Sequence, residues 1–158
     1  MAWAVVPTPW GEFWARAEGG SVVELRFPGP RPGEAGARGP VFEVLARELR
    51  EYLRGERTSF GVPVSPQGTD FQRAVWRELL RVPHGSTVTY GELAAWVGRP
   101  GAARAVGGAV GANPIAILVP CHRVLPAGGG VGGFGPGPDW KRRLLALEGV
   151  YRENPSPR

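Results

Sequence analysis

The sequence predicts an α+β protein. We expect a small N-terminal domain of one sheet and one helix over residues 1–64, and a mainly helical C-terminal domain over residues 65–158. Two observations lead to this prediction. Apolar residues in the first 27 positions form short or alternating runs, as in strands, whereas apolar residues after position 40 mostly follow helical spacing. Stretches rich in proline and glycine separate these segments.

The N-terminal residues predict three strands, over residues 2–6, 11–17 and 21–27. Prolines 7 and 9 end the first run, and Glu18-Gly19-Gly20 has the composition of a hairpin turn between the second and third runs. These three segments therefore predict a small antiparallel sheet.

A helix is predicted from residue 41 to about residue 54, after a stretch of mostly Pro, Gly, Arg and Ala. Its apolar residues recur at helical spacing, and Gly55 ends the pattern. Residues 56–68 have no periodicity and contain two prolines, which is typical of a connection between domains. No residue of this N-terminal part indicates a chemical role.

The C-terminal part begins with helix signals. Thr69 opens one capping-box pattern, and Thr89-Tyr90-Gly91-Glu92 opens a second, ahead of a short helix that ends near Gly98. Pro100 suits the first turn of another helix, which runs to about Gly111. Two short helices joined by a tight turn predict a helix-turn-helix.

The apolar residues 115–120 predict a buried strand that leads into Cys121. A glycine-rich loop follows over residues 127–137, and a last helix is predicted over residues 139–147. The loop matches the pattern Gly-x-Gly-x-x-Gly from residue 128 to residue 133, but the two prolines that follow it argue against a dinucleotide site.

Cys121 is the only cysteine, and His122 and Arg123 follow it directly. A thiol is a nucleophile only as thiolate, and cationic neighbours favour that form by lowering the thiol pKa. On an extended backbone adjacent side chains point to opposite faces, so a proton relay from Cys121 to His122 would need a water or a kinked backbone. These residues alone leave a catalytic cysteine and a small buried core residue equally open.

Composition narrows the class of partner. The net charge of +5 and the pI near 10.3 favour a polyanionic partner such as nucleic acid. One cysteine excludes an internal disulfide and fits a reducing compartment. No apolar run is long enough for a membrane span, and the first residues lack the features of a signal peptide. We therefore expect a cytoplasmic protein with no membrane partner.

Pro-Cys-His-Arg-Val, residues 120–124, resembles the active-site signature of the O6-alkylguanine-DNA alkyltransferases. Four further blocks, at residues 89–94, 102–109, 113–114 and 144–149, follow the order and spacing of that family. The resemblance implies a monomeric, single-turnover DNA repair enzyme that needs no cofactor. Such an enzyme transfers an alkyl (methyl) group irreversibly from O6-alkylguanine in double-stranded DNA to its own cysteine. The resemblance leaves O4-alkylthymine open as a second substrate.

The resemblance also assigns catalytic roles. Cys121 would be the nucleophile, and His122 with Glu148 would relay protons through a water. Tyr90 would donate to the guanine ring and help to rotate the base out of the duplex. Arg104 would insert from the second helix of the helix-turn-helix, through the minor groove, into the vacated stack.

Further residues would bind DNA or substrate. Small residues line the helix that would enter the minor groove, and Asn113 would bond to backbone as a hinge between this helix and the active-site segment. The carbonyls of Cys121 and Val124 and the amide of Gly135 would contact the base. The residues assigned to binding, besides Tyr90 and Arg104, are Ala102, Ala103, Asn113, Arg123, Val124, Gly135 and Lys141.

Two features depart from the family pattern. A single histidine outside the motif and no second cysteine leave no zinc ligand set in the first domain, so we expect no metal. Ala116 and Pro136, both in the pocket region, leave the range of accepted alkyl groups open.

Two other functions stay open. An alkyltransferase-like protein would bind and flag alkylated bases without repairing them, although such relatives replace the cysteine that this chain keeps as Cys121. A transcription factor using the helix-turn-helix alone would leave Cys121, His122 and Glu148 unexplained.

Overall fold

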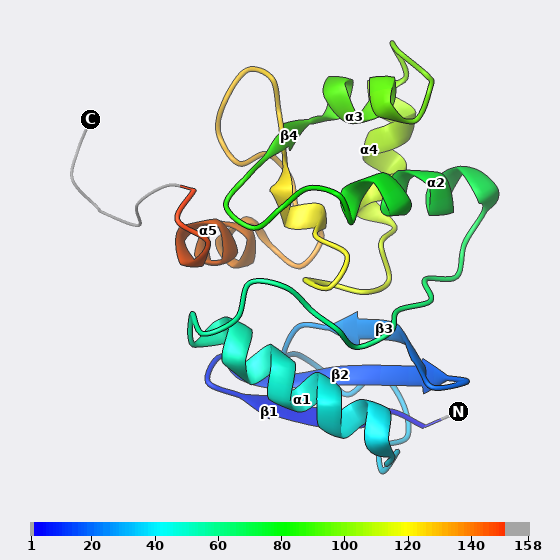
Figure 1. Ribbon diagram of the computed structural model, residues 1–158, viewed down its shortest axis with the longest axis vertical. Coiled ribbons are helices and arrows are strands. Elements are labelled where there is room, and N and C mark those ends of the chain that lie inside the picture. Colours follow the sequence, from blue (N-terminus) through cyan, green and yellow to red (C-terminus); the bar gives the residue numbers. More distant parts are fainter. Residues whose placement is uncertain (1, 151–158) are drawn as a thin grey trace.

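The computed structural model describes residues 2–150 of the chain, in two stacked parts (Figure 1). The N-terminal part is an antiparallel sheet in the order β1 (Ala4–Thr8), β2 (Gly11–Glu18), β3 (Ser21–Arg26), with helix α1 (Pro40–Leu53) packed on it. Four further helices belong to the C-terminal part. The mixture of helices and small sheets confirms the α+β class, while the division after residue 64 stays a prediction.

The three predicted strands form, with shifted ends. Gly19 and Gly20, with φ of 57° and 81°, make the tight turn between β2 and β3, because both take the left-handed conformation that glycine adopts easily. Strand β1 runs two residues further than expected and includes Pro7. The strand tolerates this proline because β1 lies at the edge of the sheet.

The connection between the two parts is held to the sheet. Val22 of β3 donates its backbone N–H to the Pro63 carbonyl at 2.9 Å and accepts from the Ser65 N–H at 2.9 Å. Glu48, a buried carboxylate of α1, accepts from the backbone N–H groups of Gly61 and Val62. This segment lacks regular structure, as predicted, but these four backbone groups are paired with the sheet or with α1.

Helices α2 (Asp70–Leu79), α3 (Tyr90–Trp96) and α4 (Ala103–Gly111) pack against one another. Both predicted capping boxes are present, with Thr69 paired to Gln72 and Thr89 paired to Glu92. The predicted helix-turn-helix is confirmed as α3 and α4. Helix α4 begins three residues later than expected, because Pro100 and Gly101, with φ of 88°, lie in the turn.

The predicted strand before Cys121 was wrong. Ile115 makes only an isolated bridge to Leu25, and residues 116–118 form a turn in which Ile117 takes a left-handed φ of 68°. The Val119 N–H donates across this turn to the Ile115 carbonyl at 3.1 Å. Cys121–Arg123 then form a 3-10 turn, η1. An apolar run indicates burial but does not specify an extended backbone, and here the segment is buried while it turns.

The remaining elements are short. Strand β4 (Val88–Thr89) pairs in parallel with β5 (Val124–Leu125), a two-residue ladder that the sequence did not indicate. The last helix, α5 (Pro138–Leu147), confirms the prediction within one residue. This ladder joins the residues directly after η1 to the residues directly before α3.

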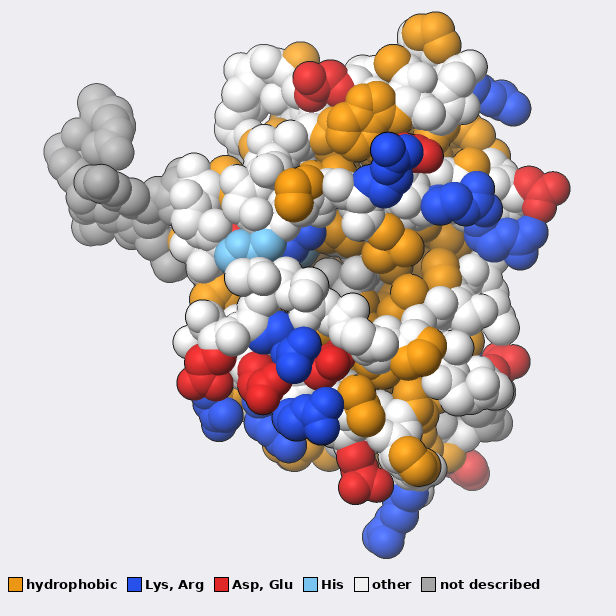
Figure 2. All heavy atoms as spheres, in the orientation of Figure 1, with side chains coloured by type: hydrophobic (Ala, Val, Ile, Leu, Met, Phe, Trp, Pro, Cys, Tyr) orange, Lys and Arg blue, Asp and Glu red, His pale blue; other side chains and the backbone are white. Residues whose placement is uncertain are grey.

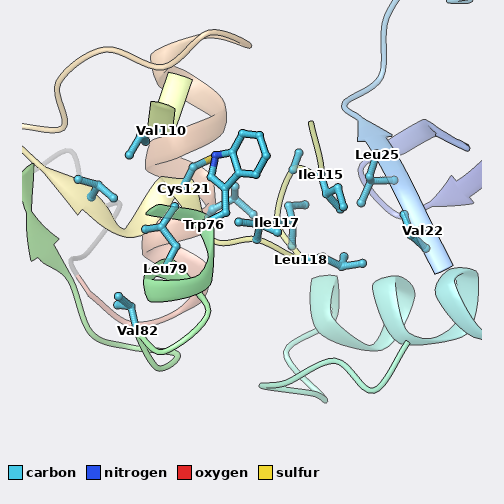
Figure 3. Close-up of a cluster of buried hydrophobic side chains, with 14 of the residues drawn as sticks. Val22, Leu25, Trp76, Leu79, Val82, Val110, Ile115, Ile117, Leu118 and Cys121 are labelled. Atoms are coloured by element: carbon cyan, nitrogen blue, oxygen red, sulfur yellow. The ribbon is translucent and has the colours of Figure 1, made fainter. Parts of the chain in front are cut away.

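The hydrophobic core is continuous between the two parts (Figure 3). Leu25 of β3 and Ile115 lie next to one another, and their segments are joined by backbone hydrogen bonds from Leu25 N–H to the Pro114 carbonyl at 3.0 Å and from Ala116 N–H to the Leu25 carbonyl at 3.1 Å. Trp76 extends the same core into the helical part. The N-terminal sheet therefore contacts the segment that leads to Cys121.

The surface carries mixed charge. On the face that Figure 2 shows, basic and acidic side chains are interspersed in the N-terminal part. No helix within residues 2–150 is long and apolar enough to cross a membrane.

Candidate active site

Cys121 lies in the wall of a cavity of about 260 Å³ between α3, α4 and the glycine-rich loop. This volume is near the small end of the range for ligand pockets. The cavity is lined by Tyr90, Gly107, Val110, Gly111, Asn113, Ala116, Cys121, Gly133, Phe134, Gly135 and Pro136. Cys121 is otherwise buried, so the cavity is the route by which a small group would reach its sulfur.

Asn113 holds the turns before Cys121 in shape. Its Nδ2 donates to the Val119 carbonyl at 2.8 Å and to the Ile115 carbonyl at 3.3 Å, and its Oδ1 accepts from the Ile115 N–H at 3.0 Å. One side chain thus satisfies backbone groups at both ends of the turning segment. These bonds fix the end of α4 relative to Cys121, as expected of a hinge residue.

His122 and Glu148 form a buried pair behind the cysteine. His122 Nε2 lies 2.9 Å from Glu148 Oε2, and the side chains of both residues are fully buried. A carboxylate can only accept, so Nε2 carries the proton and Nδ1 is left with a free lone pair. Nδ1 has no hydrogen-bond partner within residues 2–150, which leaves it as the atom that can take a proton.

Arg123 is buried and donates two hydrogen bonds to the same carboxylate. Its Nε donates to Glu148 Oε1 and its Nη2 donates to Glu148 Oε2, each at 2.8 Å, while Nη1 donates to the Val82 carbonyl at 2.7 Å. We had expected Arg123 to bind DNA or substrate. The placement gives that role no support, because the guanidinium is buried and three of its N–H groups donate to acceptors inside the protein.

Tyr52 is a residue of the site that the sequence patterns did not indicate. This residue of α1 is buried, and its hydroxyl donates a hydrogen bond to Glu148 Oε2. Its position on the buried face of α1 is consistent with the apolar pattern of that helix. No local signal in the sequence links it to a carboxylate 96 positions away.

Lys141 points inward rather than toward solvent. It is fully buried, and its Nζ donates to the Gly133 carbonyl at 3.4 Å and lies 6.0 Å from the centre of the Phe134 ring. Burial lowers the pKa of Lys141, and the nearby Cys121 opposes this shift. The side chain therefore provides positive charge near the cysteine, in place of the DNA contact that we had expected.

The Cys121 thiol is neutral in this arrangement. Burial raises its pKa above the ordinary value, and the Asn113 amide and the Lys141 ammonium offset the rise only in part. The lowered thiol pKa suggested by its cationic sequence neighbours is therefore wrong for the protein on its own. A thiolate would have to form by passing a proton to a base at the moment of reaction.

The pKa values of His122 and Glu148 are both lowered, which favours the neutral form of His122 and the charged form of Glu148. Burial lowers the pKa of His122, and the bond to Glu148 offsets this only in part, so the imidazole is neutral. Burial alone would raise the pKa of Glu148, but hydrogen bonds from His122 and Arg123 outweigh it and hold that pKa well below its usual range. The site therefore combines a neutral base with a permanent negative charge behind it.

Tyr90 and Arg104 lie on the two helices of the helix-turn-helix, and only Tyr90 lines the cavity. Tyr90, the first residue of α3, is half-buried in the cavity wall, and burial raises the pKa of its phenol. Arg104 lies exposed on α4, and within residues 2–150 no ion pair or hydrogen bond engages its side chain. Ala102 and Ala103 are half-buried at the start of the same helix.

The predicted main-chain contacts divide into two groups. Cys121 and Gly135 both line the cavity, where their backbone can meet a bound group. Val124 is buried in the β4–β5 ladder and is not a lining residue. Within residues 2–150, no cluster of three or more His, Cys, Asp or Glu side chains is placed to hold a metal ion.

Residues 70–150 match the family model for the 6-O-methylguanine DNA methyltransferase, DNA binding domain. The chain is 55% identical over 108 residues to a methylated-DNA–protein-cysteine methyltransferase of Mycobacterium bovis. That alignment covers 68% of this chain but 66% of the relative, just under two thirds of its length. A protein of the same name from Haemophilus influenzae is 39% identical over 96% of this chain and 91% of its own.

Two solved structures have a fold similar to that of this protein over nearly the whole chain. The crystal structure of Mycobacterium tuberculosis OGT in complex with DNA superposes with a TM-score of 0.84 at 41% identity, covering 94% of this chain and 92% of the other. An O6-methylguanine methyltransferase from the same organism gives the same TM-score at 39% identity, covering 97% of this chain and 96% of the other. By sequence and by fold, the chain belongs to the family of methylated-DNA–protein-cysteine methyltransferases.

Proposed function

We propose that this protein repairs DNA by accepting the methyl group of O6-methylguanine on Cys121, in a single irreversible turnover. The observation that carries the proposal is the position of Cys121 in the cavity wall, with the buried His122–Glu148 pair behind it. The substrate would be double-stranded DNA, since the similar Mycobacterium tuberculosis protein was solved with DNA.

The bonds and protons of the proposed methyl transfer balance without a cofactor. The thiol proton of Cys121 passes to Nδ1 of His122, through a water if the two groups do not touch. The sulfur then attacks the methyl carbon, the carbon–O6 bond breaks, and its electron pair stays with the guanine. The guanine takes up one proton and His122 gives up the one that it received, so that a thioether, an unmodified base and a neutral imidazole result. No step restores the thiol, which accounts for a single turnover.

The charges around the site favour this sequence of events. The resting thiol is neutral because it is buried, so the thiolate would form only when His122 accepts its proton. Glu148 would stabilise the resulting imidazolium, since its own charge is held in place by Arg123. Lys141 and Asn113, which lower the thiol pKa, would stabilise the thiolate.

The helix-turn-helix would present the damaged base to the cavity. A base inside a duplex is out of reach, so it has to be rotated out of the stack. We propose that α4 lies in the minor groove, where its small residues fit, and that Arg104 fills the vacated position. Tyr90 stands in the cavity wall at the start of α3 and would contact the rotated base.

The test is to locate the transferred methyl group. Protein incubated with a duplex that carries labelled O6-methylguanine should hold the label on the peptide that contains Cys121. Cys121→Ala should bind the same duplex with similar affinity and hold no label. Tight binding of the methylated duplex by the wild-type protein without any transfer would reject the proposal and favour a protein that only flags the lesion.

A further inference from the structure

Tyr52 connects the N-terminal part to the active site. It lies in the last turn of α1, fully buried, and its hydroxyl donates to Glu148 Oε2. The ring packs against Phe60, with ring centres 5.3 Å apart, and meets His84 edge-on at 6.1 Å. A buried tyrosine hydroxyl normally finds a hydrogen-bond partner, but here the partner is the carboxylate that supports the proposed base.

The Glu148 oxygen that Tyr52 contacts is shared by three donors. Oε2 of Glu148 accepts from Tyr52, from His122 Nε2 at 2.9 Å and from Arg123 Nη2 at 2.8 Å, whereas Oε1 accepts from Arg123 Nε at 2.8 Å. A carboxylate oxygen offers two lone pairs, so three donors on Oε2 have to share its charge. The phenol therefore competes directly with His122 for the same acceptor.

The orientation of Glu148 does not depend on Tyr52 alone. Arg123 holds both carboxylate oxygens in bidentate fashion, a geometry that fixes the plane of the group. Removal of the tyrosine hydroxyl would therefore leave Glu148 in place. It would mainly reduce the number of donors that share the charge of Oε2. Arg123 and His122 would then be the remaining donors to Oε2.

The other charged or titratable groups near the pair lie on several elements. Arg123 and Cys121 belong to η1, and the charge of Lys141 on α5 helps to lower the pKa of His122. His84 faces the Tyr52 ring from the loop before β4. Burial and the neighbouring Glu148 raise the pKa of Tyr52, so its hydroxyl keeps its proton and stays a donor over the working pH range.

We propose that Tyr52 is a positioning residue for methyl transfer, through which the N-terminal part limits how strongly Glu148 attracts a proton to His122. The inference rests on the proposed function, since it concerns the same relay. A second contact supports a role for the N-terminal part at this site, because Leu25 of β3 pairs through its backbone with the residues on either side of Ile115.

The variant that isolates this effect is Tyr52→Phe, which removes the hydroxyl and keeps the ring. Without the competing donor, Oε2 would bind the His122 proton more strongly, and the pKa of His122 would rise. The acid limb of the pH–rate profile for methyl transfer should then move to higher pH by on the order of 0.5 to 1 unit. The rate on the plateau should be retained or increased, because a more basic His122 accepts the thiol proton more readily.

The matched control is Phe60→Leu, which disturbs the packing around Tyr52 without touching Glu148. It should lower stability and leave the acid limb where it is in the wild-type protein. Because the chain has two histidines, the imidazole signal of His122 can be followed directly by NMR in all three proteins. Its midpoint should move upward in Tyr52→Phe and not in Phe60→Leu.

Two results would overturn the inference. One is an acid limb and a His122 midpoint in Tyr52→Phe that coincide with those of the wild-type protein. The other is a plateau rate that falls in Tyr52→Phe with no displacement of the limb, since this would indicate loss of packing only. Either result leaves the proposed function intact, provided that the wild-type protein transfers the methyl group. Absence of transfer by the wild-type protein would instead reject the proposed function itself.

Discussion

His122 Nε2 lies 2.9 Å from Glu148 Oε2, and neither side chain is exposed to solvent. The pairing directs the proton of the neutral imidazole toward Glu148 and leaves Nδ1 as the basic atom. The carboxylate does not need to move a proton itself. It only has to remain charged, and the bidentate Arg123 ensures that.

Glu148→Gln should slow methyl transfer at neutral pH, because it lowers the pKa of His122, and it should make the rate rise further into the alkaline range, where Cys121 ionises directly. The acid limb that follows His122 should move to lower pH. The amide keeps the shape of the carboxylate but cannot stabilise an imidazolium by charge. His122 then becomes a weaker base, and more of the thiolate has to form by direct ionisation of Cys121. Each pKa unit lost by His122 corresponds to about 1.4 kcal/mol, or roughly a tenfold lower rate.

The measurement is a single-turnover rate over a range of pH, with exposed Glu43→Gln of α1 as the control for removal of a carboxylate. Both variants should still reach one methyl group per molecule. Coincident profiles for Glu148→Gln and the wild-type protein would mean that Glu148 has only a structural role at the helix end.

Acid should destabilise the fold in two stages. The pKa of His122 is lowered in the folded state, so its contribution to stability is complete above about pH 6.5 and is lost as the pH falls below that value. The pKa of Glu148 is also lowered, so its contribution is complete above about pH 4.3 and is lost as the pH falls further.

The free energy of unfolding, measured in urea from pH 8 to about pH 3, checks this expectation. The first stage should disappear in His122→Gln and persist in His84→Gln. A free energy of unfolding that stays constant between pH 7 and pH 5 in the wild-type protein would contradict it.

Asn113→Ala should cost stability and activity together. Its removal leaves the Val119 carbonyl and the Ile115 N–H without their side-chain partner, at a cost of about 1–3 kcal/mol. The turns before Cys121 would loosen, and the transfer rate should fall. Thr87→Ala, at an exposed position, should change neither quantity in urea unfolding and rate assays. Wild-type values for Asn113→Ala would show that the hinge bonds do not matter.

Arg104→Ala should slow repair of duplex DNA much more than reaction with a free O6-alkylguanine base. Only the duplex has a stack to refill, and unstacking costs a few kcal/mol, so a loss of about tenfold or more is expected on duplex. Arg54→Ala, an exposed arginine beyond the end of α1, should react with both substrates at the wild-type rates. Equal losses of Arg104→Ala on duplex and free base would argue against insertion into the stack.

Local signals in the sequence predicted the helices well. The two capping boxes located the starts of α2 and α3 because a capping box is a set of hydrogen bonds within four residues. The apolar run before Cys121 failed as a strand prediction. Its burial was correct, but Asn113 and the left-handed Ile117 set the backbone into turns, and no periodicity reports that.

The contacts of Arg123 and Tyr52 with Glu148 could not be predicted from the sequence, although the His122–Glu148 pair was. Arginine is almost never fully buried unless it is paired, so Arg123 looked like a surface or DNA contact until its partner Glu148 was placed beside it. Tyr52 looked like an ordinary residue of a helix face for the same reason. Both assignments depend on how α1, η1 and the end of α5 meet in three dimensions.

A single, irreversible transfer of one methyl group to Cys121 is the basis of the proposed function. Its most direct test is the intact mass of the protein during incubation with a large excess of duplex DNA that contains O6-methylguanine. The mass should increase by one methyl group in place of one hydrogen, and repair should stop when every molecule carries it. Continued repair by protein whose mass does not change would contradict single-turnover transfer to Cys121.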